Sequence, residues 1–232
     1  GDKVKVGQLI ANANGFISAP VHSSVSGTVK GIEIIKDLAG NPCKAVVIEV
    51  EGDEWVETID RSEEIAREIK LDSKEIIEKI KECGVVGLGG ATFPTNVKLS
   101  PPPGKKAEFL IINGAECEPY LTSDYRVLLE MPEQVLIGAA IMMKALNVTQ
   151  GFVGIEENKP EAIRIMTEKA KAYPQIKIVS LKKKYPQGGE KQLIDAVVGR
   201  KVPSMGLPID TGAVVQNVGT ALAVYEAVQK NK

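Results

Sequence analysis

Residues 107–120 read Ala-Glu-Phe-Leu-Ile-Ile-Asn-Gly-Ala-Glu-Cys-Glu-Pro-Tyr, an apolar run followed by a turn of small and polar residues. The run over 107–112 has the length and composition of a buried strand. Beyond its end, Asn113, Glu116 and Glu118 supply amide and carboxylate groups. In open α/β sheets, ligands bind outside the carboxyl ends of the strands. This stretch therefore predicts both a sheet and a ligand-binding edge.

Helical and strand patterns alternate around this strand. Downstream, the sequence predicts strands over 151–155, 176–181 and 213–216, and helices over 132–146, 158–173, 189–198 and 219–229. Upstream, it predicts helices over 63–70 and 74–83. Two helix starts carry a capping-box spacing, Asp72 with Glu75 and Asn158 with Glu161. Strands that alternate with helices of this length predict an α/β domain with a mainly parallel sheet.

The N-terminal segment has a different pattern. Short β-prone pieces are separated there by Gly, Pro, Asn and Asp, and no helical periodicity is present. This pattern predicts a small all-β module. We place the module at 1–55 and the α/β domain at 56–232.

Composition excludes several classes of protein. The chain has 232 residues, of which 44% are hydrophobic and 25% charged, values typical of a globular protein. The net charge of −1 gives no reason to expect nucleic-acid binding. No apolar stretch approaches the ~20 residues that span a bilayer. The three cysteines form no C-x-x-C pair, and with one histidine they predict neither a disulfide framework nor a metal site.

Four loops carry the candidate chemistry. Residues 84–95 contain clustered glycines, which let a backbone approach a ligand and turn N–H groups toward anions, and Lys98 follows them. This loop follows a helix and lacks the dinucleotide-binding spacing, so it is not a Rossmann fingerprint. The others are 113–120, 185–191 with a Gly-Gly pair at a helix start, and 216–220. Taken singly, each loop is equally compatible with an ordinary turn or helix cap.

Together these loops resemble a known family. The runs 87–102, 113–122, 185–190 and 215–220 strongly resemble the C subunit of the Rnf electron-transport complex, and the resemblance covers nearly the whole chain. A more distant similarity is to the flavoprotein subunit of respiratory complex I, which binds FMN and NADH. Residues 1–29 resemble the barrel-sandwich hybrid fold of biotinyl and lipoyl domains.

The resemblance implies a barrel-sandwich module followed by a Rossmann-like α/β domain that binds FMN and NAD(H). It implies that the glycine loop and Lys98 hold FMN, that Phe93 faces the dinucleotide, and that no residue acts as an essential acid or base. The cofactor-binding residues that it implies are Gly87, Gly89, Gly90, Phe93, Lys98, Asn113, Glu116, Glu118, Tyr185, Gly188, Glu190, Asn217 and Thr220.

The implied function is that of an electron-transfer component of a membrane-bound ferredoxin:NAD oxidoreductase, peripheral on the cytoplasmic side of the inner membrane. Its implied partners are NADH and the other subunits of the complex, without nucleic acid. Family members carry 4Fe-4S cluster motifs of the form C-x-x-C-x-x-C-x-x-x-C-P, which this chain lacks, so the clusters are expected outside it.

Two alternatives stay open. One is a flavin-free scaffold, like the A subunit of the sodium-pumping NADH:quinone oxidoreductase, because Ala115 and Gly189 stand where the complex I pattern has acids. The other is a biotinyl- or lipoyl-like carrier. The hairpin stretch 21–25 contains no lysine to modify, and this weakens the carrier hypothesis.

Overall fold

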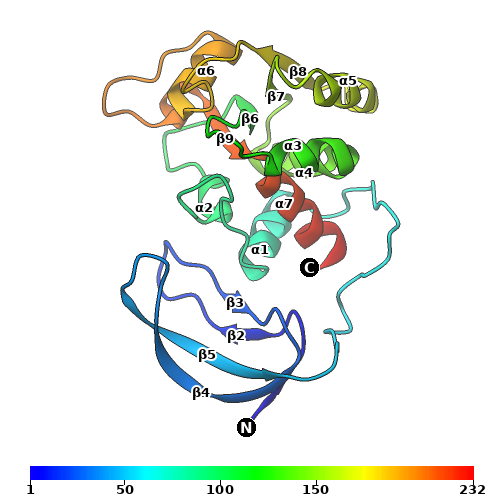
Figure 1. Ribbon diagram of the computed structural model, residues 1–232. Helices are drawn as coiled ribbons and strands as arrows, with labels where there is room; N and C mark the ends of the chain where they lie inside the picture. Colours follow the sequence, from blue (N-terminus) through cyan, green and yellow to red (C-terminus); the bar gives the residue numbers. More distant parts are fainter.

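The computed structural model describes residues 1–232 and separates a small β module from a larger α/β domain (Figure 1). In the module, a three-stranded antiparallel sheet has the order β1-β4-β5, and β2 pairs with β3 in a separate hairpin. The bounds are β1 Lys3–Val4, β2 Leu9–Ala11, β3 Val21–His22, β4 Gly27–Lys36 and β5 Pro42–Val50. The predicted all-β module is confirmed.

A long extended segment joins the two parts and lies along the last helix, α7 (Val218–Lys230). The helix predicted over 63–70 is wrong, because the backbone of this segment bonds to α7 side chains. The Gln229 amide donates to the carbonyl oxygens of Ala66 and Glu68, each at 3.0 Å. The Ala66 N–H donates to the Tyr225 hydroxyl at 3.2 Å. Side chains distant in sequence therefore replace the i to i−4 bonds of a helix.

The α/β domain is built on a four-stranded parallel sheet with the order β8-β7-β6-β9. The bounds are β6 Phe109–Gly114, β7 Gln150–Glu156, β8 Ile176–Leu181 and β9 Ala213–Asn217. From β6 the chain adds β7 and β8 on one side and then returns to add β9 on the other. The strand order thus reverses between β6 and β9, and such a switch point is where open α/β sheets bind ligands.

Helices cover both faces of this sheet. One face packs on α3, α4, α5 and α7 through a large apolar core, to which α1 adds from the far side of α4 and α7, and the other face packs on α6 through a smaller core. The remaining bounds are α1 Ser73–Glu82, α2 Thr95–Lys98, α3 Ser123–Glu130, α4 Pro132–Leu146, α5 Pro160–Lys169 and α6 Glu190–Val198. Short 3₁₀ turns lie at Ala170–Ala172 and Pro208–Thr211.

Of the two predicted capping boxes, one is confirmed and the other is wrong. The capping box of Asp72 and Glu75 at the start of α1 is confirmed. The predicted box of Asn158 and Glu161 is wrong: α5 begins at Pro160 after an N-cap at Lys159, with no side-chain cap. Proline at the first helical position supplies a preset φ and has no N–H that needs a cap. The short helices α2 and α3 were not predicted.

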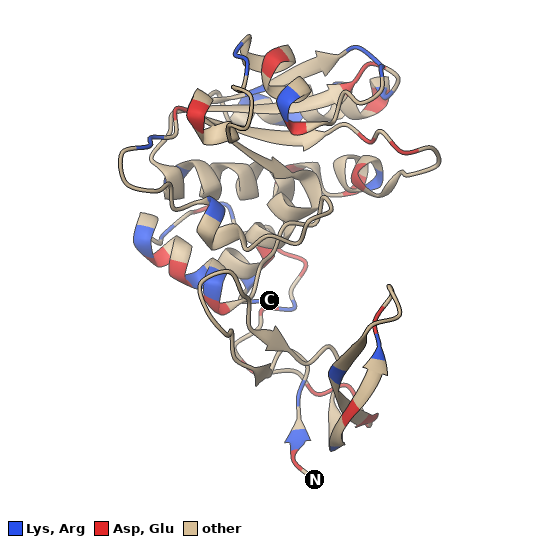
Figure 2. Ribbon diagram, turned by 90° about the vertical axis from the view of Figure 1, so that its left-hand side faces the viewer, with Lys and Arg blue, Asp and Glu red and all other residues tan.

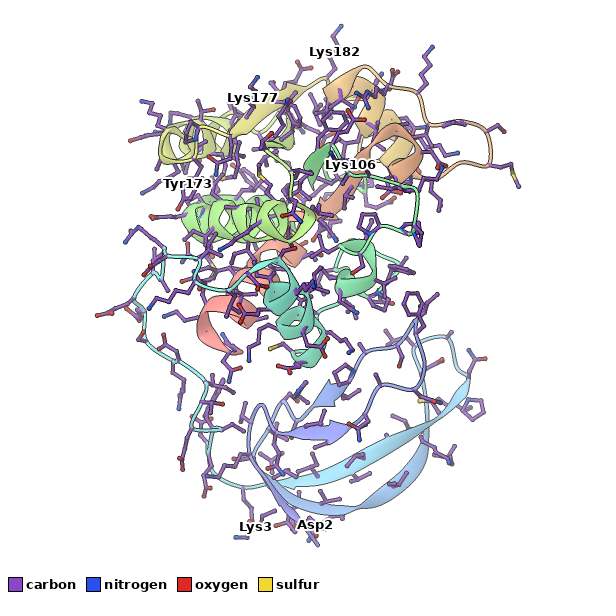
Figure 3. The ribbon with its side chains drawn as sticks, turned by 180° about the vertical axis from the view of Figure 1, so that it is seen from behind. Asp2, Lys3, Lys106, Tyr173, Lys177 and Lys182 are labelled. Carbon is purple, nitrogen blue, oxygen red and sulfur yellow. The ribbon has the colours of Figure 1, made fainter.

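Basic and acidic residues are distributed along both parts of the chain (Figure 2). The basic run 182–184 is exposed, and Figure 3 shows Lys182 extending away from the domain. None of the helices has the length and apolar composition that crossing a membrane requires.

Candidate functional site

A cleft of about 310 Å³ opens at the switch point of the sheet. Its walls are the glycine-rich loop before α2, the carboxyl ends of β6 and β9, and the start of α6. Most of the predicted cofactor-binding residues line it: Gly87, Gly89, Gly90, Phe93, Lys98, Asn113, Gly188, Glu190, Asn217 and Thr220. Loops from four separate places in the sequence therefore meet at one point.

Two glycines shape the loop for different reasons. A Cβ on Gly89 would lie 3.1 Å from the Cβ of Asn217, so a side chain there would press the loop away from the start of α7. At Gly90, φ is +140°, and a Cβ would meet no atom within 4 Å. The backbone at Gly90 is thus open toward space that a ligand can approach closely.

An ion pair joins two walls of the cleft. Nζ of Lys98, at the end of α2, lies 3.0 Å from Oε1 of Glu190 in the first turn of α6. The two side chains are 33% and 40% exposed, so the pair contributes at most about 1 kcal/mol. An anionic ligand can therefore recruit Lys98 without a large loss of stability.

Three predicted polar residues, Asn113, Asn217 and Thr220, form hydrogen bonds within the protein. The Asn113 amide donates to the Gly188 carbonyl oxygen at 2.9 Å, which ties the β6 loop to the loop before α6. Asn217 caps α7 by accepting from the Thr220 N–H at 3.2 Å. The buried Thr220 hydroxyl accepts from the Leu88 N–H at 2.9 Å. These side chains hold the cleft walls in register.

A second hydrogen bond fixes the orientation of the Asn217 side chain. Its Nδ2 donates to Oδ2 of Asp124 at 2.6 Å. Burial is the largest influence on Asp124 and raises the pKa of its carboxyl above the usual range. The amide is thus fixed at both ends, by the helix cap and by Asp124.

Three predicted residues, Glu116, Glu118 and Tyr185, lie outside the cleft and line a neighbouring pocket. Glu116 is buried because it accepts from the backbone N–H groups of Asp124 and Tyr125, at 2.8 and 3.3 Å, and pairs with Lys159. Its carboxylate thus stabilises the start of α3, where negative charge is favoured.

Four other cleft residues, Ala91, Thr92, Val215 and Gln216, were missing from the predicted set. Thr92 has a φ of +49°, a left-handed conformation that is a genuine outlier for a β-branched residue. Gln216 is 3% exposed, and its Nε2 has no hydrogen-bond partner. Both residues lie inside candidate loops predicted from the sequence, Thr92 in 84–95 and Gln216 in 216–220.

The residues present fit a phosphorylated, aromatic cofactor such as FMN. Open backbone at Gly90 and the Lys98 ammonium suit a phosphate. The unpartnered Gln216 amide and the ring of Phe93 suit the edge and face of a planar ring system. The volume of the cleft, about 310 Å³, falls at the lower end of the range found for cofactor sites.

Comparison with family models matches both parts of the chain. Residues 80–226 match the family described as the Nuo51 FMN-binding domain. Residues 1–53 match the RnfC barrel sandwich hybrid domain. The second match confirms the barrel-sandwich expectation for the module.

Curated relatives support the resemblance seen in the sequence. The chain is 52% identical over 231 residues to the C subunit of the proton-translocating ferredoxin:NAD(+) oxidoreductase complex of Clostridium ljungdahlii, covering 99% of this chain and 50% of that protein. It is 45% identical over 229 residues to the Na(+)-translocating counterpart of Acetobacterium woodii, covering 98% and 51%. The chain thus spans about half the length of these relatives.

Solved structures agree on the fold. The NAD+-reducing [NiFe]-hydrogenase, in its air-oxidized state, matches with a TM-score of 0.58 and 25% identity over 68% of this chain and 30% of that chain. The same enzyme in its H2-reduced state matches with a TM-score of 0.58 and 26% identity over 68% and 31%.

Proposed function

The chain belongs to the Nuo51 FMN-binding domain family, and on that premise we propose that its cleft binds FMN and serves electron exchange with NAD(H). The observation that carries the proposal is the meeting of the glycine-rich loop, Lys98 and Gln216 at the switch point between β6 and β9. Backbone N–H groups and a lysine recognise phosphate, and amides recognise ring edges.

Each wall of the cleft contributes different groups to the proposed binding of FMN. The open backbone at Gly90 and the Lys98 ammonium hold the cofactor phosphate, and Gln216 meets the ring. Asn113, Asn217 and Thr220 keep the loops at a fixed separation through the bonds described above. When bound, FMN supplies the exchange of a hydride with nicotinamide and of single electrons with iron–sulfur clusters. The protein contributes orientation and exclusion of water, and no side chain needs to move a proton.

The roles of Phe93 and Glu190 follow from their position at the mouth. Phe93 is 38% exposed and lines the cleft, so its ring is available to stack on the dinucleotide. Glu190 pairs with Lys98 inside the cleft and would limit the space beside a bound flavin. Glu118 and Tyr185 line the neighbouring pocket and not the cleft.

For the whole protein, we propose a component of an Rnf-type ferredoxin:NAD oxidoreductase complex. The names of the relatives from Clostridium ljungdahlii and Acetobacterium woodii support this assignment. We propose that its 4Fe-4S clusters lie outside this chain, which lacks the C-x-x-C-x-x-C-x-x-x-C-P motif that holds them. As part of such a complex, the chain is proposed to be peripheral, on the cytoplasmic face of the inner membrane.

The flavin-free scaffold is the less favoured alternative. The matched family is described as an FMN-binding domain, and the cleft keeps its open glycine, lysine and unpartnered amide. A scaffold would have no use for a buried amide without a partner, because such a group costs about 1–3 kcal/mol.

Titration of the purified chain with FMN, followed by anaerobic NADH, tests the proposal. We expect saturable quenching of flavin fluorescence and loss of the flavin absorbance band on addition of NADH. A folded sample that does not bind FMN would refute the flavin assignment. Binding without bleaching by NADH would refute the NAD(H) assignment for this chain.

A matched pair of lysine variants locates the site. Lys98→Met removes the ammonium from the cleft and should weaken FMN binding about tenfold to a hundredfold, the usual worth of a charged hydrogen bond to phosphate. Lys106→Met removes an exposed lysine outside the cleft, labelled in Figure 3, and should leave FMN affinity unchanged. Equal effects of the two variants would contradict the placement of the phosphate.

A further inference from the structure

A carboxylate outside the cleft holds one of the residues that line it. Asp124, in the first turn of α3, was not among the predicted site residues and does not line the cleft. Its Oδ2 accepts from Nδ2 of Asn217 at 2.6 Å, and the Gly219 N–H adds a second hydrogen bond to the same carboxylate. The start of α3 is thereby joined to the start of α7 (Figure 1).

The Asn217 amide has one donor left for a ligand. Its Oδ1 accepts from the Thr220 N–H at 3.2 Å, so the oxygen is committed to the helix cap. Of the two N–H groups of the amide, the protein uses one, in the bond to Asp124. Nδ2 lies 3.5 Å from the position that a Cβ on Gly89 would occupy, and Asn217 lines the cleft beside that loop. The remaining N–H is therefore available to a ligand held by the glycine-rich loop.

The elements packed around Asp124 bring two charged side chains to it. The loop after β6 brings Glu116 and the N-cap of α5 brings Lys159, and these two form an ion pair with each other. The first turn of α7 carries no acidic residue, and Glu133 at the start of α4 pairs with Arg67. No cation in the fold is thus dedicated to the Asp124 carboxylate.

The ionised form of Asp124 is unfavourable for the folded protein. Burial, the largest influence, and Glu116 raise the pKa of its carboxyl above the usual range, and the hydrogen bonds from Asn217 and Gly219 offset this only in part. A raised pKa means that folding favours the neutral carboxyl, so above that pKa the charge lowers stability. Charges held in spite of such a penalty are concentrated at functional sites.

We propose that Asp124 is a positioning residue for the flavin site, which in its ionised form directs the Asn217 amide toward the bound cofactor and makes FMN binding depend on pH. The proposal rests on the proposed function. An ionised acceptor at one N–H holds the amide in one orientation and polarises the other N–H, because linked hydrogen bonds strengthen one another. Protonation replaces the charged acceptor by a neutral one, so FMN affinity falls as the pH falls through the pKa of Asp124.

Titration of the 232-residue chain with FMN at a series of pH values compares the parent with Asp124→Asn, which keeps an acceptor oxygen but carries no charge. At neutral pH we expect Asp124→Asn to bind FMN about fivefold to tenfold more weakly, the difference between a charged and a neutral hydrogen bond. This deficit should shrink as the pH falls, because the parent carboxyl then becomes neutral as well. The FMN phosphate also titrates, at about pH 6, but it does so equally for both proteins. Asp195→Asn, at an exposed position of α6 outside the cleft, is the matched control and should follow the parent.

Thermal unfolding without ligand separates positioning from a purely structural role. We expect Asp124→Asn to be at least as stable as the parent at neutral pH, because it removes an unfavourable charge. A residue that only supports the fold would lower Tm and FMN affinity together. A lower Tm in Asp124→Asn, or an affinity ratio that stays constant with pH, would therefore overturn the proposal.

The outcomes also separate this proposal from the flavin assignment. If the parent binds FMN and Asp124→Asn binds it equally at every pH, the positioning role is refuted and the flavin site stands. If the parent itself, in a folded sample, binds no FMN, both are refuted.

Discussion

Replacing Thr92 by glycine should stabilise the protein while weakening the ligand site. Thr92 has a φ of +49° and lies in the glycine-rich loop, with its side chain lining the cleft. A left-handed conformation costs an L-residue about 1–2 kcal/mol, and none of the protein's hydrogen bonds uses the Thr92 hydroxyl to offset it. Glycine removes that strain but adds about 0.5–1 kcal/mol of backbone entropy. The net gain is therefore between zero and about 1.5 kcal/mol.

Thermal unfolding followed by circular dichroism measures this gain. For a domain of this size, 1 kcal/mol corresponds to a rise of about 2–4 °C in Tm. Thr122→Gly is the matched control, because Thr122 is also exposed but has a φ of −140° and makes no side-chain cap. There glycine relieves no strain and should lower Tm.

The same variants connect the strain to function. Strained residues persist where the surrounding structure and a function hold them in place. We expect Thr92→Gly to weaken FMN binding several-fold, because it loosens the loop and removes the hydroxyl, and Thr92→Ser to restore most of the affinity. A Thr92→Gly protein that is less stable than the parent would refute the strain argument. An unchanged FMN affinity would refute the functional reason for it.

Three further predictions concern the frame that holds the site. Gly138→Ala should destabilise the α/β domain by about 1–3 kcal/mol in urea unfolding, because its Cβ would overlap the backbone oxygen of Ala221 in α7; an unchanged midpoint would contradict this packing. Glu116→Gln should cost about 3–5 kcal/mol in the same assay, since it leaves a buried lysine unpaired, and Glu118→Gln at an exposed position should not. Hydrogen bonds from Lys230 lower the pKa of Asp60 to about 2, so the stability that this carboxylate contributes is present above pH 3.8 and lost as pH falls through about 2. Asp60→Asn should therefore be less stable than the parent at pH 6 and equal to it near pH 2, and a constant difference would refute the linkage.

Much of the fold and part of the site could be predicted from the sequence. The strand over 176–181 and the helix over 132–146 have the predicted bounds, because a continuous apolar run, a proline in the first turn and helical periodicity are local properties. The capping box of Asp72 and Glu75 is local for the same reason. The glycine-rich loop and Lys98 were predicted together because the motif that contains them is long and specific.

Only the tertiary structure determines which hydrogen-bond partners the polar groups have. Residues 63–70 are extended because α7, more than 150 positions later, takes their backbone hydrogen bonds. Glu116 turned away from the cleft because Lys159, on another loop, satisfies its carboxylate. Glu118 and Tyr185 line a pocket beside the cleft and not the cleft itself. Local pattern sets which backbone conformation a segment adopts, whereas a buried charge or amide goes to whichever partner the fold brings within hydrogen-bond distance, and that partner is distant in sequence.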